Sequence, residues 1–224
     1  AYPSIVGSGA NACILHYTDN DSTLQNGQLV LIDAGCEYQH YAADITRTFP
    51  VSGEFSPTQR ALYDIVLAAN QAAIAQCHPG ALFNAPHEAA IATMVEGLIA
   101  LGLLQGEAAD IIRSEAYLQF CPHKSCHWLG LDVHDVGDYR LAGEWRPLQP
   151  GMVLTVEPGI YIPVDVTGRD NQQVSNAAGF VIEAARGIGI RIEDDVLITE
   201  SGCEVLSQSV PKTADEIEAL MRAA

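Results

Sequence analysis

Four acidic residues lie at the ends of short apolar runs, where they could bind cations: Asp33, Asp44, Glu157 and Glu193. Carboxylates at strand ends can point into one cleft and be held closely enough to ligate a metal ion. Each acid alone is more often a solvated strand terminus or turn residue, so the prediction rests on their occurring together. In residues 190–193, the period-two alternation places Arg191 and Glu193 on the face opposite the two isoleucines.

Histidines add nitrogen donors to these carboxylates. Three of them, His123, His127 and His134, fall within twelve positions and alternate with apolar residues. One histidine alone is more often a core residue, but this grouping favours a site. Cys121 and Cys126 in the same segment resemble half of a zinc knuckle. They have no second Cys/His pair at a matching interval, which disfavours structural zinc.

Strands must position the acids. The β-rich runs 12–17 and 28–33 and the alternating run 44–49 predict three strands, the last returning beside the second. Strands are expected again at 152–156 and 189–199. The polar stretch 163–186 between them predicts a long surface loop.

Helices occupy the middle and the end of the chain. Ser56 as N-cap and Pro57 at the first helical position begin one helix, which ends before Pro79. A second follows Pro86 to about residue 101, and a short one is expected at 108–114. Thr213 opens the last helix with a capping box. The sequence therefore predicts one α+β domain, with antiparallel strands and helices packed on one face.

Composition narrows the function classes. The chain has 224 residues, is 48% hydrophobic and carries a formal net charge of −17, from 28 acidic and 11 basic residues. A negative net charge of this size repels phosphate groups and therefore disfavours binding to nucleic acid or to anionic membranes. No apolar run approaches the length of a membrane span, and no signal peptide is recognisable. Six scattered cysteines suggest free thiols, so a cytoplasmic location is expected.

Seven segments together resemble aminopeptidase P, an Xaa-Pro aminopeptidase of the pita-bread metallopeptidases, whose metal-binding part prolidase and methionine aminopeptidase share. These segments are residues 14–17, 31–35, 44–49, 125–130, 133–137, 156–159 and 187–194, including Ser125-Cys126-His127-Trp128-Leu129-Gly130 and Val156-Glu157-Pro158-Gly159. The resemblance runs in order from about residue 5 to residue 222. It implies a pita-bread fold, in which helices cover a curved antiparallel sheet with two pseudo-symmetric halves.

The resemblance implies five ligands for two divalent ions, with Mn²⁺ expected and Co²⁺, Fe²⁺ or Zn²⁺ as alternatives. Asp33 would bind one ion and His127 the other. Asp44 and Glu193 would bridge both ions, and Glu157 would bind the ion that His127 holds. Four carboxylates balance two M²⁺ ions, which would activate water to attack a peptide carbonyl.

The resemblance also implies roles around the metals. Glu157 would transfer a proton, His134 would stabilise the tetrahedral intermediate, and His16 would help to position the scissile bond. The expected substrate contacts are His123, Val133, Tyr161 and Arg191. The substrate would be a peptide with proline in second position.

Two departures accompany the resemblance. Lys124 and Cys126 stand where family members more often carry small residues. The family's catalytic domain starts with two helices ahead of the first strands and follows an N-terminal domain. We therefore expect residues 1–224 to be a catalytic domain without these elements. An uncovered sheet face would then favour a partner chain or a homo-oligomer.

Two alternative functions remain open at this stage. A prolidase would cleave Xaa-Pro dipeptides with the same chemistry, and it needs a cation for the free carboxylate. A non-catalytic pita-bread module is the other alternative, although the intact ligand set argues against it.

Overall fold

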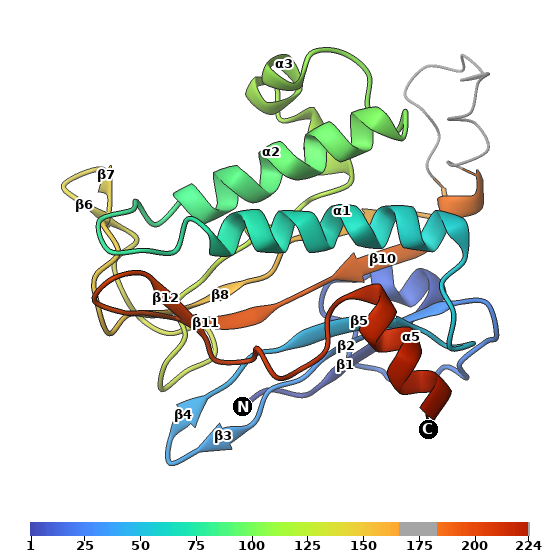
Figure 1. Cartoon of the computed structure of the whole chain (residues 1–224), viewed down its shortest axis with the longest axis horizontal. Helices are drawn as coiled ribbons and strands as arrows, with labels where there is room; N and C mark the ends of the chain where they lie inside the picture. Colours follow the sequence, from blue (N-terminus) through green and yellow to red (C-terminus); the bar gives the residue numbers. More distant parts are fainter. Residues whose placement is uncertain (166–182, 224) are drawn as a thin grey trace.

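Two long helices cover one side of a group of antiparallel strands (Figure 1). The computed structural model describes residues 1–165 and 183–223. The helices are α1 (Pro57–Ile74) and α2 (Ala85–Ala100), and they lie side by side. Every paired strand among the described residues is antiparallel. The α+β class and the helix-covered face are therefore as predicted.

The first half of the chain forms a three-stranded sheet. Its order is β1 (Ile5–Ser8), β2 (Leu29–Asp33) and β5 (Thr46–Pro50), with β2 in the centre. Asp33 is the last residue of β2 and pairs with Thr46, two residues after Asp44. This register holds the first two acids at the same end of the sheet.

The second half supplies a similar arrangement. β11 (Asp194–Ile198) lies between β8 (Val153–Val156) and β12 (Cys203–Val205), while β9 (Gly159–Ile162) pairs with β10 (Ile188–Arg191). Asp194 is opposite Val156, so Glu157 and Glu193 extend from facing strand ends. The second pair of acids is thus also set by strand register.

Polar contacts join the halves along β5 and β10. The Thr48 hydroxyl donates to the Arg191 carbonyl at 2.9 Å, and the Glu193 amide donates to the Thr46 carbonyl at 3.1 Å. The buried Arg47 donates to the Glu193 carbonyl at 2.6 Å and pairs with Asp194 at 2.8 Å. These contacts fix one pair of acids against the other.

Helix α1 is built as the sequence predicted. Ser56 caps it in a capping box with Gln59, and Pro57 is its first residue. Its buried face packs into the main core, which also contains α2 and the isoleucines of β9 and β10. Asn70 on this face is fully buried and donates to the carbonyls of Val156 and Ile192 at 3.2 and 3.4 Å. The helix therefore holds the residues that precede Glu157 and Glu193.

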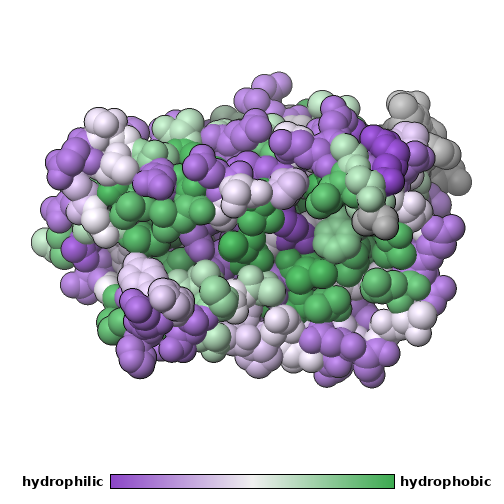
Figure 2. Space-filling model, turned by 60° about the horizontal axis from the view of Figure 1, so that its bottom comes forward, coloured by the Kyte–Doolittle hydropathy of each residue, from purple (hydrophilic) through white to green (hydrophobic). Residues whose placement is uncertain are grey.

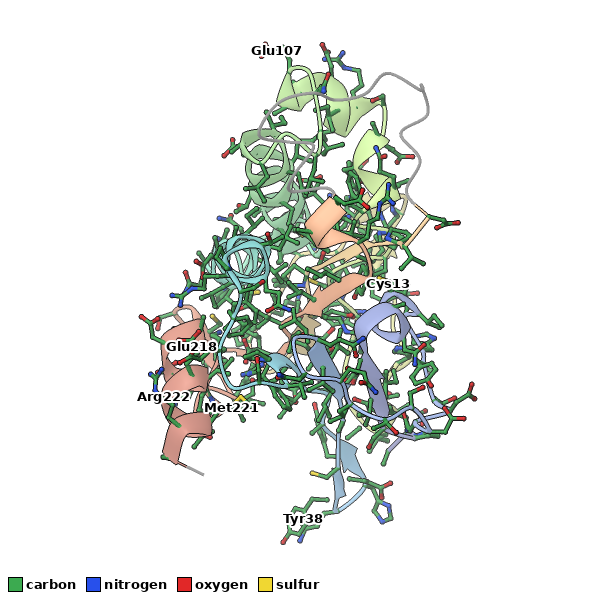
Figure 3. The ribbon with its side chains drawn as sticks, turned by 90° about the vertical axis from the view of Figure 1, so that its right-hand side faces the viewer. Cys13, Tyr38, Glu107, Glu218, Met221 and Arg222 are labelled. Carbon is green, nitrogen blue, oxygen red and sulfur yellow. The ribbon has the colours of Figure 1, made fainter. Side chains whose placement is uncertain are left out.

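Smaller elements complete the chain: the 3₁₀ helices at Gly9–Cys13 and Ala116–Gln119, α3 (Ala108–Arg113), α5 (Ala214–Ala223), and the hairpins β3 (Glu37–Tyr38) with β4 (Tyr41–Ala42) and β6 (Arg140–Leu141) with β7 (Glu144–Trp145). Figure 3 shows Tyr38 at the tip of the first hairpin, pointing away from the rest of the chain. The Thr213–Glu216 contacts that open α5 match the predicted capping box.

Two predicted strands are wrong. Residues 12–17 form no strand, because the chain turns back at Gly9 (φ +55°) into a 3₁₀ turn that packs against Gly189. The run 189–199 is divided between β10 and β11, which belong to different sheets and separate at Ile192 and Glu193. Most of the predicted loop 163–186 lies outside the described residues. In the described part of the chain, no helix combines the length and apolarity that a membrane crossing requires.

Gly35 offers a test of how tightly the first two acids are packed. A Cβ atom there would lie 1.6 Å from the Ala43 carbonyl oxygen, so the backbone beside Asp44 would have to move. We expect Gly35→Ala to lower the free energy of unfolding by about 1–3 kcal/mol in urea denaturation. Gly202→Ala is the matched control, because a Cβ there meets nothing within 4 Å. Equal stability of the two variants would contradict this packing.

Candidate metal centre

The five predicted ligands line one cavity of about 240 Å³: Asp33, Asp44, His127, Glu157 and Glu193. His16, His123, His134, Lys124 and Arg191 line it as well. Figure 2 brings the lower side of Figure 1 forward and shows hydrophobic residues on both sides of a recessed hydrophilic area. Strands from both halves of the chain therefore converge on one polar recess.

Three of the five ligands form a compact donor group. One ligand atom each from Asp44, His127 and Glu193 lies within 4.8 Å of the other two. The Nε2 atom of His127 lies 3.4 Å from a carboxylate oxygen of Asp44 and 3.4 Å from one of Glu157. A cation placed among these atoms would meet oxygen and nitrogen donors on several sides.

Hydrogen bonding prepares His127 to act as a ligand. Its Nδ1 lies 3.0 Å from the Trp128 carbonyl oxygen, which can only accept, so Nδ1 is assigned the proton. With Nδ1 engaged in this way, Nε2 is the ring atom that faces the carboxylates and that would bind a metal ion. Metal-binding histidines commonly have this arrangement, because the outer hydrogen bond fixes the tautomer and the ring.

Asp33 is held by two donors from outside the acid group. Arg191 Nη2 donates to its Oδ2 at 2.6 Å, and the Tyr2 hydroxyl donates to its Oδ1. The same hydroxyl also donates to Asp44. Arg191 is 3% exposed, so its positive charge offsets part of the carboxylate charge inside the protein.

Crowding of the acids changes their protonation. Burial, followed by the charges of nearby carboxylates, holds the pKa of Glu193 well above its usual range. Burial likewise raises the pKa of Glu157 to about 7, against the attraction of His127 and Arg191. Divalent cations would remove this repulsion. The donor set therefore fits hard or borderline metal ions with oxygen-rich ligation.

The structure places the predicted catalytic histidines and the predicted substrate-binding residues differently. His16 is exposed at the cavity wall, and the His134 ring lies 4.5 Å from the His127 ring. Tyr161 is buried, and its hydroxyl accepts from Arg191 Nη1 at 2.9 Å and lies 2.9 Å from His123 Nε2. Val133 is half-buried and does not line the cavity. Its predicted contact with substrate has no support from this geometry.

Two residues near the centre were not predicted from the sequence. Tyr2 lies 31 and 42 residues before the acids that it binds, within a segment that shows no motif. Asn70 lies on the buried face of α1, where one polar residue does not alter the helical pattern. The polar side chain of Asn70 among the mainly apolar residues of that face was its only clue.

The raised pKa of Glu157 predicts how the stability of chelator-treated protein depends on pH. Between pH 4.5 and about 7 the folded protein retains a proton that the unfolded chain releases, so the unfolding free energy falls as pH rises. We expect this fall in urea titrations of the wild type and a shallower one in Glu157→Gln. Parallel profiles of the two proteins over this window would contradict the prediction.

Tyr2 offers a second test. Tyr2→Phe removes the hydroxyl shared by Asp33 and Asp44 while keeping the ring. We expect divalent-metal affinity, measured by calorimetry, to fall about 10- to 100-fold, as for other groups that orient ligands. Tyr38→Phe, on the exposed hairpin, is the control. Unchanged affinity in Tyr2→Phe would show that the hydroxyl does not organise the two acids.

Comparisons with known proteins agree with this geometry. The Xaa-Pro aminopeptidase of Escherichia coli is 51% identical over 100% of this chain and 48% of its own length. The human Xaa-Pro dipeptidase is 40% identical over 99% of this chain and 49% of its own length. The solved structure of Pseudomonas aeruginosa aminopeptidase PepP superposes with a TM-score of 0.92 at 54% identity, covering 99% of this chain and 48% of that one.

This chain thus spans about half the length of the curated relatives that it matches. The resemblance to aminopeptidase P and the pita-bread fold are confirmed. The profile of metallopeptidase family M24 matches residues 1–200. The chain therefore belongs to metallopeptidase family M24.

Proposed function

We propose that this protein is a metal-dependent aminopeptidase that removes the N-terminal residue from peptides with proline in second position. The observation that carries the proposal is the convergence of four carboxylates and the His127 Nε2 atom on one cavity. The high identity to an Xaa-Pro aminopeptidase supports the same substrate class.

Two divalent ions, with Mn²⁺ preferred, would be held by Asp33, Asp44, His127, Glu157 and Glu193. When bound, they would supply Lewis-acid activation of water and of the scissile carbonyl. Four carboxylates match the charge of two such ions, which is why two are proposed rather than one. A cytoplasmic location and a homo-oligomer remain predictions.

The protein's own groups would handle protons and orientation. Glu157, whose carboxylate lies 3.4 Å from His127 Nε2 at the cavity wall, would take a proton from water and pass it to the departing amine. His134 and His16 stand at the cavity wall, where they could hydrogen-bond the carbonyl and the scissile region. Burial lowers the pKa of His123 to about 4, so this ring is neutral beside Tyr161. Such a neutral, partly aromatic wall suits a proline ring.

The second candidate is a dipeptidase that cleaves Xaa-Pro. The human Xaa-Pro dipeptidase among the relatives favours it, because the same ligand group would serve both reactions. The two functions differ in where the substrate carboxylate lies. A tripeptide with proline in second position and the matching dipeptide therefore distinguish them.

The test combines metal analysis with turnover of an Xaa-Pro-Xaa peptide in Mn²⁺. We expect near two ions per chain and a loss of at least about 100-fold in kcat/KM in Glu193→Ala, because a buried ligand is removed. Glu204→Ala removes an exposed acid of β12 and should retain activity. A metal-free protein that is indifferent to chelators would contradict the proposal. Turnover of the dipeptide alone would favour the second candidate.

A further inference from the structure

A second, larger cavity opens from the candidate metal centre. This groove has a volume of about 950 Å³ and is walled mainly by apolar and aromatic side chains, among them Phe83, Ile91, Ile112, Tyr117 and Trp145. It shares Lys124, Cys126, His127 and His134 with the metal cavity. A groove of this size is comparable with pockets that hold drug-sized ligands, so it exceeds the needs of one side chain.

Lys124 lies where the two cavities meet. It is one of only two lysines in a chain with a net charge of −17. The other, Lys212, is committed to Asp194 at 2.7 Å and to Asn70 at 2.9 Å. The ammonium of Lys124 makes no ion pair or hydrogen bond within residues 1–165 and 183–223, although four carboxylates line the same cavity.

Three other ionisable groups of the groove, His87, Arg140 and Glu88, each contact a neighbour within the protein. Burial, followed by the charge of Lys124, lowers the pKa of His87 to about 4, and its Nδ1 faces the Ser125 hydroxyl at 3.1 Å. The Arg140 guanidinium stacks on Trp145 at 4.0 Å from the ring centroid. Glu88 accepts a hydrogen bond from Asn84. Arg140 keeps its charge but lines only the groove, so Lys124 is the unpaired cation of the described residues that lines both cavities.

The direction of the substrate follows from the proposed function, on which this inference rests. An aminopeptidase substrate has one residue before the scissile bond, so a groove that holds several residues must take those after the proline. Lys124 directly follows His123, which lies beside Tyr161 in the candidate proline pocket. The residue after the proline would pass closest to Lys124.

We propose that Lys124 is a specificity-determining residue that binds a carboxylate carried by the residue after proline, while the side chain or chain continuation of that residue enters the apolar groove. The carboxylate has two possible sources. One is the free C-terminus of a tripeptide, and the other is an Asp or Glu side chain in a longer peptide. The charge and the apolar wall together select substrates with an acidic group and an apolar group downstream of the proline.

The experiment compares kcat/KM for Ala-Pro-Phe with a free or an amidated C-terminus, using the Mn²⁺-loaded protein. We expect the wild type to favour the free acid by about tenfold, through KM, because a charge-assisted pair is lost in the amide. In Lys124→Met, which keeps the length of the apolar stem, the ratio should fall to about one. Arg146→Gln removes a charge from the neighbouring pocket that is lined by Trp128, and should keep the wild-type ratio.

Two further measurements make the outcome decisive. Faster turnover of amidated Ala-Pro-Asp-Ala than of amidated Ala-Pro-Asn-Ala would identify a side-chain carboxylate as a second acceptable source. The product Pro-Phe should inhibit the wild type more strongly than Pro-Phe amide does. The two compounds should inhibit Lys124→Met equally. This binding readout does not depend on turnover by the variant.

Equal turnover of acid and amide by the wild type, with activity present, would overturn this inference and leave the proposed function intact. A Lys124-dependent preference for the dipeptide Ala-Pro over Ala-Pro-Phe would place the carboxylate on the proline itself and also overturn it. Absence of hydrolysis of every Xaa-Pro peptide would remove both the function and the inference.

Discussion

Electrostatic repulsion among four buried carboxylates is the constraint on which this structure depends. Asp33, Asp44, Glu157 and Glu193 share a cavity of about 240 Å³, where burial makes each additional negative charge costly. Arg191 and His127 offset part of this charge, yet the pKa values of Glu157 and Glu193 remain raised. A chain that gathers acids in this way gains affinity for divalent cations at the expense of metal-free stability.

The fold meets this constraint by placing two acids on each half and joining the halves rigidly. Neither three-stranded sheet holds a complete donor set. The contacts of Thr48 with Arg191 and of Thr46 and Arg47 with Glu193 bring the pairs together. Asn70 adds a tie from α1 to the strand ends that precede Glu157 and Glu193. Buried polar groups that are fully hydrogen-bonded are suited to fixing a single arrangement of this kind.

The same cavity also separates two kinds of surface. One wall is the hydrogen-bonded row of the charged Arg191 and the uncharged Tyr161 and His123, in which each group is held by its neighbour. The other side opens through Lys124 into the apolar groove. The acid cluster, the row of Arg191, Tyr161 and His123, and the apolar groove thus meet at one place, which fits the proposed peptide substrate.

The amino-acid sequence determined the local features and the donor residues. Apolar runs ending in Asp33 and Glu157, the Ser56 capping box and the helical spacing of α1 each follow from short-range physics, as does the opening of α5 at Thr213. The motifs around His127 indicated the family, because ligand spacing and strand ends are legible along the chain.

Only the tertiary structure decided which distant groups meet. The apolar content of residues 12–17 favoured a strand, yet Gly9 and the close approach to Gly189 made a turn more stable. The run 189–199 divides at Glu193 because its two ends pair with different sheets. Tyr2 reaches Asp33 and Asp44, and Lys124 reaches the groove, through packing between segments far apart in sequence. Local patterns encode strands and helices, whereas long-range contacts depend on how those elements pack, and no single segment carries that information.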